Sequence, residues 1–195
     1  MAVLPDQQRM KRIEDRCLEW MEKGTPMGAA QIAEDLVLLP DMPMHCPYHH
    51  FLVPAALLTS AHLHAGSTTE RLAKDLKLAK ERAGMVPGGI CGQWGSCGAA
   101  LGVGIFSAIW RNTSPLSKDG WANGNLITAR CLEEIATVEG PRCCKRVTYL
   151  AIRAAVTIAR EELGVDMGAF PEMRCRFSSQ NRECRKEACP FYAGE

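Results

Sequence analysis

The sequence predicts an all-α fold, a single bundle-like domain of about seven helices that ends in an irregular, cysteine-rich tail. Apolar residues recur at helical spacing over most of the chain, and no stretch alternates apolar and polar residues as a strand would. From about Ala169 onward the chain is short of aliphatic residues and rich in arginine and cysteine. We therefore assign residues 1–168 to a helical domain and 169–195 to a metal-binding tail that packs on it.

Local sequence signals predict the helices and the loops between them. The N-terminal segment MAVLPDQQRMKRIEDRCLEW is amphipathic and lacks the apolar core of a signal peptide. The sequence STTE at residues 67–70 is a capping box that starts the fourth helix. Loop-forming residues occupy 84–89 and 112–120. Helices are expected near 6–23, 27–38, 47–65, 68–84, 96–111, 121–138 and 141–164.

The composition excludes several classes of protein. The chain has 195 residues, of which 47% are hydrophobic and 23% charged, as is ordinary for a globular domain. A net charge of +1 gives no field that would attract nucleic acid or an anionic membrane. The longest nearly apolar run, residues 98–110, is too short to span a bilayer. We expect a cytoplasmic protein that binds neither nucleic acid nor membrane, and the oligomeric state is not predicted.

Ten cysteines are the unusual feature of the composition. In a reducing cytosol they indicate metal or redox chemistry rather than disulfides. Cys17 and Cys131 each stand alone inside a helical pattern, so we interpret them as small buried apolar residues. The remaining cysteines fall in four short segments and are candidates for function.

Three of these segments place cysteine at the predicted start of a helix. In HCPYHH a proline suits the first helical position and leaves Cys46 at the cap. In WGSCGAALG a serine is a good N-cap and Cys97 follows it. In GPRCCKR a proline opens the last helix, with Cys143 and Cys144 in its first turn. The unpaired N–H groups and partial positive charge of a helix start lower the pKa of a thiol and favour the thiolate.

The two adjacent cysteines are not equivalent on this helix. At about 100° per residue Cys144 falls on the apolar face and Cys143 near the border of the two faces. We therefore interpret Cys144 as the metal ligand and Cys143 as the more accessible, reactive thiol. The neighbouring cations favour thiolate and are candidates for binding a small anionic substrate: Arg142, Lys145 and Arg146.

Histidines and glycines accompany the cysteines. His49 shares a helical face with Cys46 and is a candidate catalytic residue. His50 is a candidate substrate-binding residue, although a hydrogen-bonded core histidine is at least as consistent with the sequence. His45, His62 and His64 follow no specific pattern. Glycines in the loop at 88–95 allow the backbone around Cys91 to approach a bound group, whereas Gly98 and Gly102 are explained by close helix packing.

The tail carries the pattern C-x8-C-x4-C-P, with Cys175, Cys184 and Cys189. No histidine follows residue 64, which excludes a local Cys/His zinc finger. Three thiols are one short of a closed zinc site, and the final Cys-Pro is similar to the end of bacterial ferredoxin motifs. The pattern favours an iron–sulfur cluster over zinc, with either a fourth ligand from elsewhere in the chain or one open iron.

Four segments together resemble a cysteine-rich domain family of unknown function from anaerobic archaea and bacteria, over residues 44–192. They are CPYHHFLVPAALL, CGQWGSCGAALGVGIFSAI, GPRCCKR and NRECRKEACPFY. The resemblance implies that the cysteines and histidines of these segments belong to the family's motifs, and it implies no activity. More distantly, CGAALG resembles a family described as redox-active and named for a C-GCAxxG-C-C pattern, with CGA here in place of GCA.

The leading hypothesis is an iron–sulfur protein with one or two clusters of the 4Fe–4S type. It would act in redox or sulfur-transfer chemistry on a small anionic molecule or with a redox-protein partner. The alternatives, which stay open at this point, are a zinc-binding structural or regulatory module and a metal-free thiol enzyme with Cys143 as nucleophile. The candidate metal ligands are Cys175, Cys184, Cys189, Cys46, Cys91, Cys97 and Cys144. The candidate catalytic residues are Cys143, Cys97, His49 and Arg142.

Overall fold

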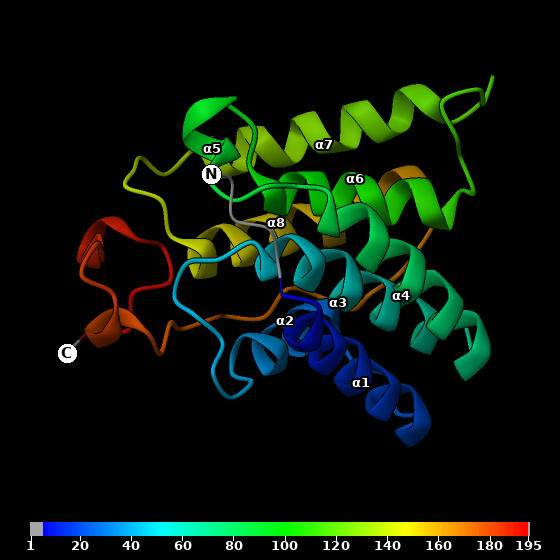
Figure 1. The fold of residues 1–195 in the computed structure, drawn as a ribbon, viewed down its shortest axis with the longest axis horizontal. Helices are drawn as coiled ribbons and strands as arrows, with labels where there is room; N and C mark the ends of the chain where they lie inside the picture. Colours follow the sequence, from blue (N-terminus) through cyan, green and yellow to red (C-terminus); the bar gives the residue numbers. More distant parts are fainter. Residues whose placement is uncertain (1–5, 195) are drawn as a thin grey trace.

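The computed structural model describes residues 6–194, and within that range the chain is all-helical, without a strand (Figure 1). The predicted all-α fold is confirmed. The helices are α1 Gln7–Lys23, α2 Ala29–Val37, α3 Tyr48–His64, α4 Thr69–Gly84, α5 Ile90–Gln93, α6 Gly98–Trp110, α7 Trp121–Ala136 and α8 Cys144–Ile158. The helix missing from the sequence-based assignment is the four-residue α5, which lies in the glycine-rich stretch expected to be a loop.

Helix α3 is the centre of the bundle. Every residue from Tyr48 to Leu63 is buried, and a helix that is apolar on all sides has to be covered on all sides. The helices α1, α2, α4, α6 and α8 all pack against it. The N-terminal end of α3, which carries the histidines of the HCPYHH segment, is thereby held inside the molecule.

Helices α3 and α6 approach closely because α6 carries glycine where they meet. A Cβ atom on Gly102 would lie 2.8 Å from Cδ of Pro54 and 3.0 Å from the carbonyl oxygen of His50. One on Gly98 would lie 2.1 Å from the His50 ring. The prediction that these two glycines serve close helix packing is confirmed. The contact holds the start of α6 against the first turn of α3.

The tail returns from the end of α8 to the beginning of the same helix (Figure 1). A π-helical turn, Ala159–Leu163, ends α8, and the tail contains only two short 3-10 turns, Ser178–Gln180 and Lys186–Ala188. The N–H of Cys175 donates to the carbonyl of Phe191 at 2.7 Å. The Phe191 ring is 3% exposed and packs edge-on against Tyr149 of α8, with ring centroids 5.3 Å apart. The tail is therefore anchored on α8.

Two further sequence-based interpretations can be checked on the fold. Cys17 and Cys131 are both completely buried, and burial raises the pKa of each thiol to about 12, so their interpretation as apolar core residues is confirmed. Among the helices of residues 6–194, none combines the length and the apolar character needed to cross a membrane.

The close approach of α3 and α6 predicts an asymmetry between two glycine substitutions. Gly102→Ala should lower the free energy of unfolding by about 1–3 kcal/mol, because the new methyl group overpacks the contact with Pro54. Gly124→Ala in α7 has nothing within 4 Å of the new atom and should leave stability unchanged or raise it by up to about 1 kcal/mol. Chemical denaturation of the two variants measures the difference. Equal stability of both variants would contradict the packing described here.

Candidate functional site

The cysteine-bearing helices begin slightly later than the sequence predicts. Cys143 is itself the N-cap of α8, with φ −142° and ψ 109°, and Cys144 is the first helical residue. Cys97, rather than the preceding serine, is the N-cap of α6. Pro47 is the N-cap of α3, so Cys46 lies just before the helix. The proline of GPRCCKR therefore precedes the helix instead of opening it.

This shift changes the direction of the Cys143 side chain. The angular argument assumed helical backbone at both thiols, whereas the cap residue is extended. Cys143 is only 7% exposed, so the expectation that it lies at the rim as the more accessible thiol is wrong. Cys144 is half-buried. The two adjacent cysteines consequently belong to different surroundings.

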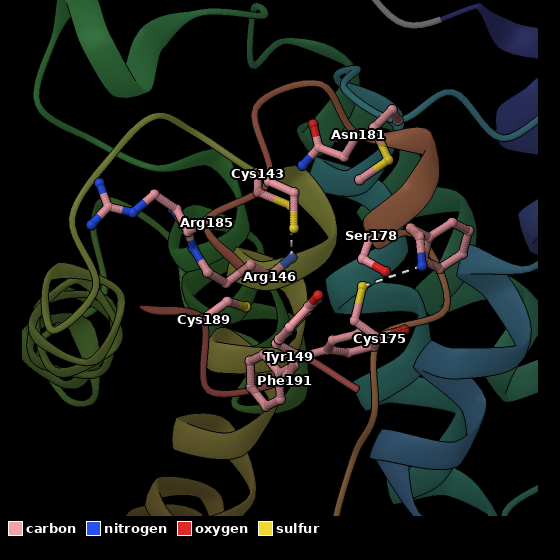
Figure 2. Close-up of a pocket in the computed structure, with 13 residues that line it drawn as sticks. Cys143, Arg146, Tyr149, Cys175, Ser178, Asn181, Arg185, Cys189 and Phe191 are labelled. Carbon is pink, nitrogen blue, oxygen red and sulfur yellow. Dashed lines mark hydrogen bonds between the residues drawn. The ribbon is translucent and has the colours of Figure 1, made fainter. Parts of the chain in front are cut away.

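Cys143 lines one pocket together with the three tail cysteines, Cys175, Cys184 and Cys189. Figure 2 shows the side chains of Cys143, Cys175 and Cys189 pointing toward the same space, as does the hydroxyl of Tyr149. The pocket thus combines the three thiols of the tail with a fourth thiol, that of Cys143, at the start of α8. Other walls of the pocket are largely aromatic or apolar and include Met44, Phe177, Phe191 and Tyr192.

Backbone N–H groups point at three of the four sulfur atoms in this pocket. Each donor lies two or three residues after the cysteine that accepts, at donor–sulfur distances of 3.4–3.5 Å. Hydrogen bonds of this kind favour the thiolate over the thiol. The pairs are Arg146 N–H to Cys143, Phe177 N–H to Cys175 and Lys186 N–H to Cys184.

Two cations are buried beside the thiols. Lys145 is 0% exposed, its Nζ donates to the carbonyl of Val37 at 3.3 Å, and it lies 4.7 Å from the centre of the Phe177 ring. Burial lowers the pKa of Lys145 to about 8, while neighbouring cysteines oppose that shift. We expected Lys145 on a cationic rim, but the tail and the α2 end cover it.

Arg146 is 4% exposed and lines the four-cysteine pocket. Its Nη2 donates to the carbonyls of Pro141 and Glu139 at 2.9 and 3.2 Å, and its Nε is buried without a hydrogen-bond partner in the described structure. Within residues 6–194, neither Lys145 nor Arg146 forms an ion pair with a carboxylate. Buried charges are costly without a counter-charge, and the groups at hand that can supply one are the thiols.

Burial outweighs the helix starts in setting the pKa of these thiols. It raises the pKa of Cys46, Cys97, Cys143 and Cys175, and that of Cys144 to about 12, although backbone N–H groups or nearby cations oppose the shift. The expectation of lowered pKa values is therefore wrong for the metal-free protein. A bound metal would deprotonate the same thiols outright.

A second group of cysteines lies near the starts of other helices. Cys46 directly precedes the N-cap of α3, Cys97 is the N-cap of α6 and Cys144 is the first residue of α8, and these three helices pack against one another. Cys91 is exposed on α5, where its charge acts on Cys97. His49 contacts Cys46, with 3.3 Å between its Nδ1 and the sulfur.

The structure separates the two neighbouring histidines. Nδ1 of His50 lies 3.1 Å from the carbonyl of Val86, and the ring packs under Gly98, as for a hydrogen-bonded core histidine. His50 is 9% exposed and Arg142 is exposed, so these two of the four candidate substrate-binding residues differ in access to solvent. Their roles in binding a substrate stay predictions.

His45 is a site residue that the sequence did not single out. The N–H of Cys144 donates to its Nδ1 at 3.5 Å, and its Nε2 lies 3.2 Å from both Asn181 Oδ1 and Glu183 Oε2. The ring therefore joins the start of α8 to the tail. Its position directly before Cys46 was the available signal, but the role depends on how the tail docks.

The thiols are not arranged around a single ion. Across residues 6–194, no group of three or more Cys, His, Asp or Glu side chains is placed to hold one metal ion. The four cysteines of the tail pocket nevertheless share its walls.

The fold and the site define an all-α protein whose C-terminal tail closes a four-cysteine pocket on the start of its last long helix. The chain belongs to a family of unknown function (DUF5714), which matches residues 13–192. No curated protein and no solved structure matches the chain.

The burial of the thiols predicts the order in which they react. In the reduced, metal-free protein iodoacetamide should modify exposed Cys91 well before Cys143, and should modify Cys17 and Cys131 only after denaturant is added. Peptide mass spectrometry over a time course measures the order. Modification of Cys143 ahead of Cys91 would contradict the pocket described here and restore the accessible-nucleophile hypothesis.

Proposed function

We propose that the tail pocket binds an iron–sulfur cluster through Cys143, Cys175, Cys184 and Cys189, and that the protein uses it in redox chemistry. The observation that carries the proposal is the convergence of Cys143 with the three tail cysteines on one pocket. Four cysteine thiolates are the usual ligand set of a 4Fe–4S cluster. The backbone N–H groups directed at three of these sulfurs add support, since such hydrogen bonds tune iron–sulfur centres.

Charge supports the same proposal. A cluster with four thiolate ligands is anionic, and Lys145 and Arg146 are buried cations without a carboxylate partner within residues 6–194. The unpartnered Nε–H of Arg146 lines the pocket and is available to a cluster sulfur. A bound cluster would therefore supply the missing counter-charge and accept the missing hydrogen bond.

Zinc is the second candidate, because four cysteines are also a complete structural zinc site. The final Cys-Pro of the tail, which is similar to the end of bacterial ferredoxin motifs, favours the cluster. A zinc site would make the tail a structural or regulatory module. The metal-free thiol enzyme is weakened by the burial of Cys143 and by the raised pKa of its thiol.

When bound, the cluster would transfer one electron at a time. The chain's own contribution is to bury the centre among aromatic side chains and to offset its charge. Arg142 and Arg185 are exposed near the pocket, and Arg185 donates to the carbonyl of Gly140 at 2.7 Å. We propose that this edge meets a small anionic molecule or a redox-protein partner, in the cytoplasm. The resemblance to proteins of anaerobes makes purification without oxygen the appropriate starting point.

Metal and sulfide analysis of anaerobically purified protein tests the proposal. The wild type should be coloured and contain at least about four iron atoms per chain, with equal labile sulfide. Cys189→Ala and Cys175→Ala should each lose the iron of this site, because each removes a ligand. Cys131→Ala, a buried cysteine of α7 outside the pocket, is the matched control and should keep its full iron content.

A colourless protein with one zinc ion per chain would overturn the cluster proposal and support the zinc-binding module instead. Full iron retention in both tail variants would show that the tail cysteines are not ligands and would overturn the assignment.

A further inference from the structure

Three cysteines outside the tail pocket lie at the starts of three helices that pack against one another. Cys46 directly precedes the N-cap of α3, Cys97 is the N-cap of α6, and Cys144 is the first residue of α8. Each pair among α3, α6 and α8 is in contact. This arrangement brings together thiols separated by about fifty residues at each step of the chain.

Local contacts bring the three helix starts to the same place. The N–H of Cys144 donates to Nδ1 of His45, the residue before Cys46. Gly98, the residue after Cys97, lies against the ring of His50 in the first turn of α3. The segment from residue 45 to 50 therefore connects Cys97 with Cys144.

A buried, unpartnered nitrogen lies beside these thiols. His49 is 1% exposed, and its Nδ1 lies 3.3 Å from the Cys46 sulfur and 3.0 Å from the Cys46 carbonyl oxygen. With the proton on Nδ1 donated to that carbonyl, Nε2 carries a free lone pair. Nε2 is buried and has no hydrogen-bond partner in the described structure. Native interiors seldom leave such a nitrogen unsatisfied, so it indicates a bound group.

Cysteines of both groups act on the pKa of the buried Lys145 ammonium. Cys46 and Cys144 of the inner group, and Cys143 and Cys175 of the tail pocket, raise this pKa against the larger, opposite effect of burial. Lys145 directly follows Cys143 and Cys144 in the chain, and its ammonium is fully buried without a carboxylate partner within residues 6–194.

We infer that Cys46, Cys97 and Cys144 hold a second iron–sulfur cluster, separate from the tail cluster and adjacent to it across the Cys143–Cys144 peptide. The inference goes beyond the proposed function and does not depend on it. Cysteines at the starts of three helices that pack together supply the kind of thiolate ligands that an iron–sulfur cluster takes. Three cysteine ligands would leave one iron of a four-iron cluster without a thiolate.

With two adjacent clusters bound, the tail cluster would transfer electrons to the inner cluster. An external one-electron carrier would reduce the tail cluster, whose pocket is lined by the exposed Arg185. The tail cluster would then return to its oxidised form by passing that electron to the inner cluster. The electron lost by one centre is the electron gained by the other, so this step forms and breaks no bond and transfers no proton.

Iron and sulfide content of two sets of variants tests the inference in the full-length chain. The inner set is Cys46→Ala, Cys97→Ser and Cys144→Ala, and the tail set is Cys175→Ala and Cys189→Ala, with Cys131→Ala as control. All are loaded with iron and sulfide without oxygen. We expect each set to lose half of the wild-type iron and the combination Cys144→Ala/Cys189→Ala to lose all of it. The retained half also reports that a variant has folded.

The outcomes separate the two claims. Full iron in the inner set with loss in the tail set would overturn the second cluster and leave the proposed function standing. Loss in the inner set alone would overturn the tail site and leave the second cluster. Electron paramagnetic resonance of the reduced wild type is independent of any variant. Two interacting spins are expected, and a single isolated cluster with about four irons would overturn the pairing of two clusters.

Discussion

The site depends on two buried positive charges in the first turn of α8. Lys145 is fully buried and Arg146 nearly so, and within residues 6–194 neither is paired with a carboxylate. Such charges destabilise a fold unless an anion lies within reach. Arg146 lines the same pocket as Cys143 and the three tail cysteines, and Lys145 directly follows Cys144 in the chain. Thiolates ligated to metal would supply the anion, whereas burial raises the pKa of the free thiols Cys143, Cys144 and Cys175.

The rest of the fold positions those thiols. The all-round apolar character of α3 places its first turn inside the molecule, and glycines on α6 let Cys97 approach it. The tail, which has little regular structure of its own, is held by Phe191 against Tyr149 and through Asn181 and Glu183 on His45. A bound cluster would complete this attachment, because its ligands would come from both the tail and α8.

The sequence predicts the features that depend on local pattern. Helical periodicity is enough for the all-α class, isolated cysteines in helical patterns are enough for the burial of Cys17 and Cys131, and glycines at helical spacing indicate close packing. Sequence-based prediction fails where the position of a side chain depends on contacts with residues distant in the chain. Cys143 turns to the tail because it is an extended cap residue, and Lys145 is buried in contact with residues from distant segments. His45 gains its role only through the docked tail.

The central claim is that the adjacent cysteines belong to different centres, with Cys143 completing the tail site. Native mass spectrometry of the anaerobically isolated wild type and of Cys143→Ala tests it directly. The account predicts a wild-type mass that exceeds the polypeptide by iron and sulfide, and a Cys143→Ala mass that lacks the tail cluster but retains the inner one. A wild-type mass equal to the bare chain, or to the chain with one zinc ion, would contradict it.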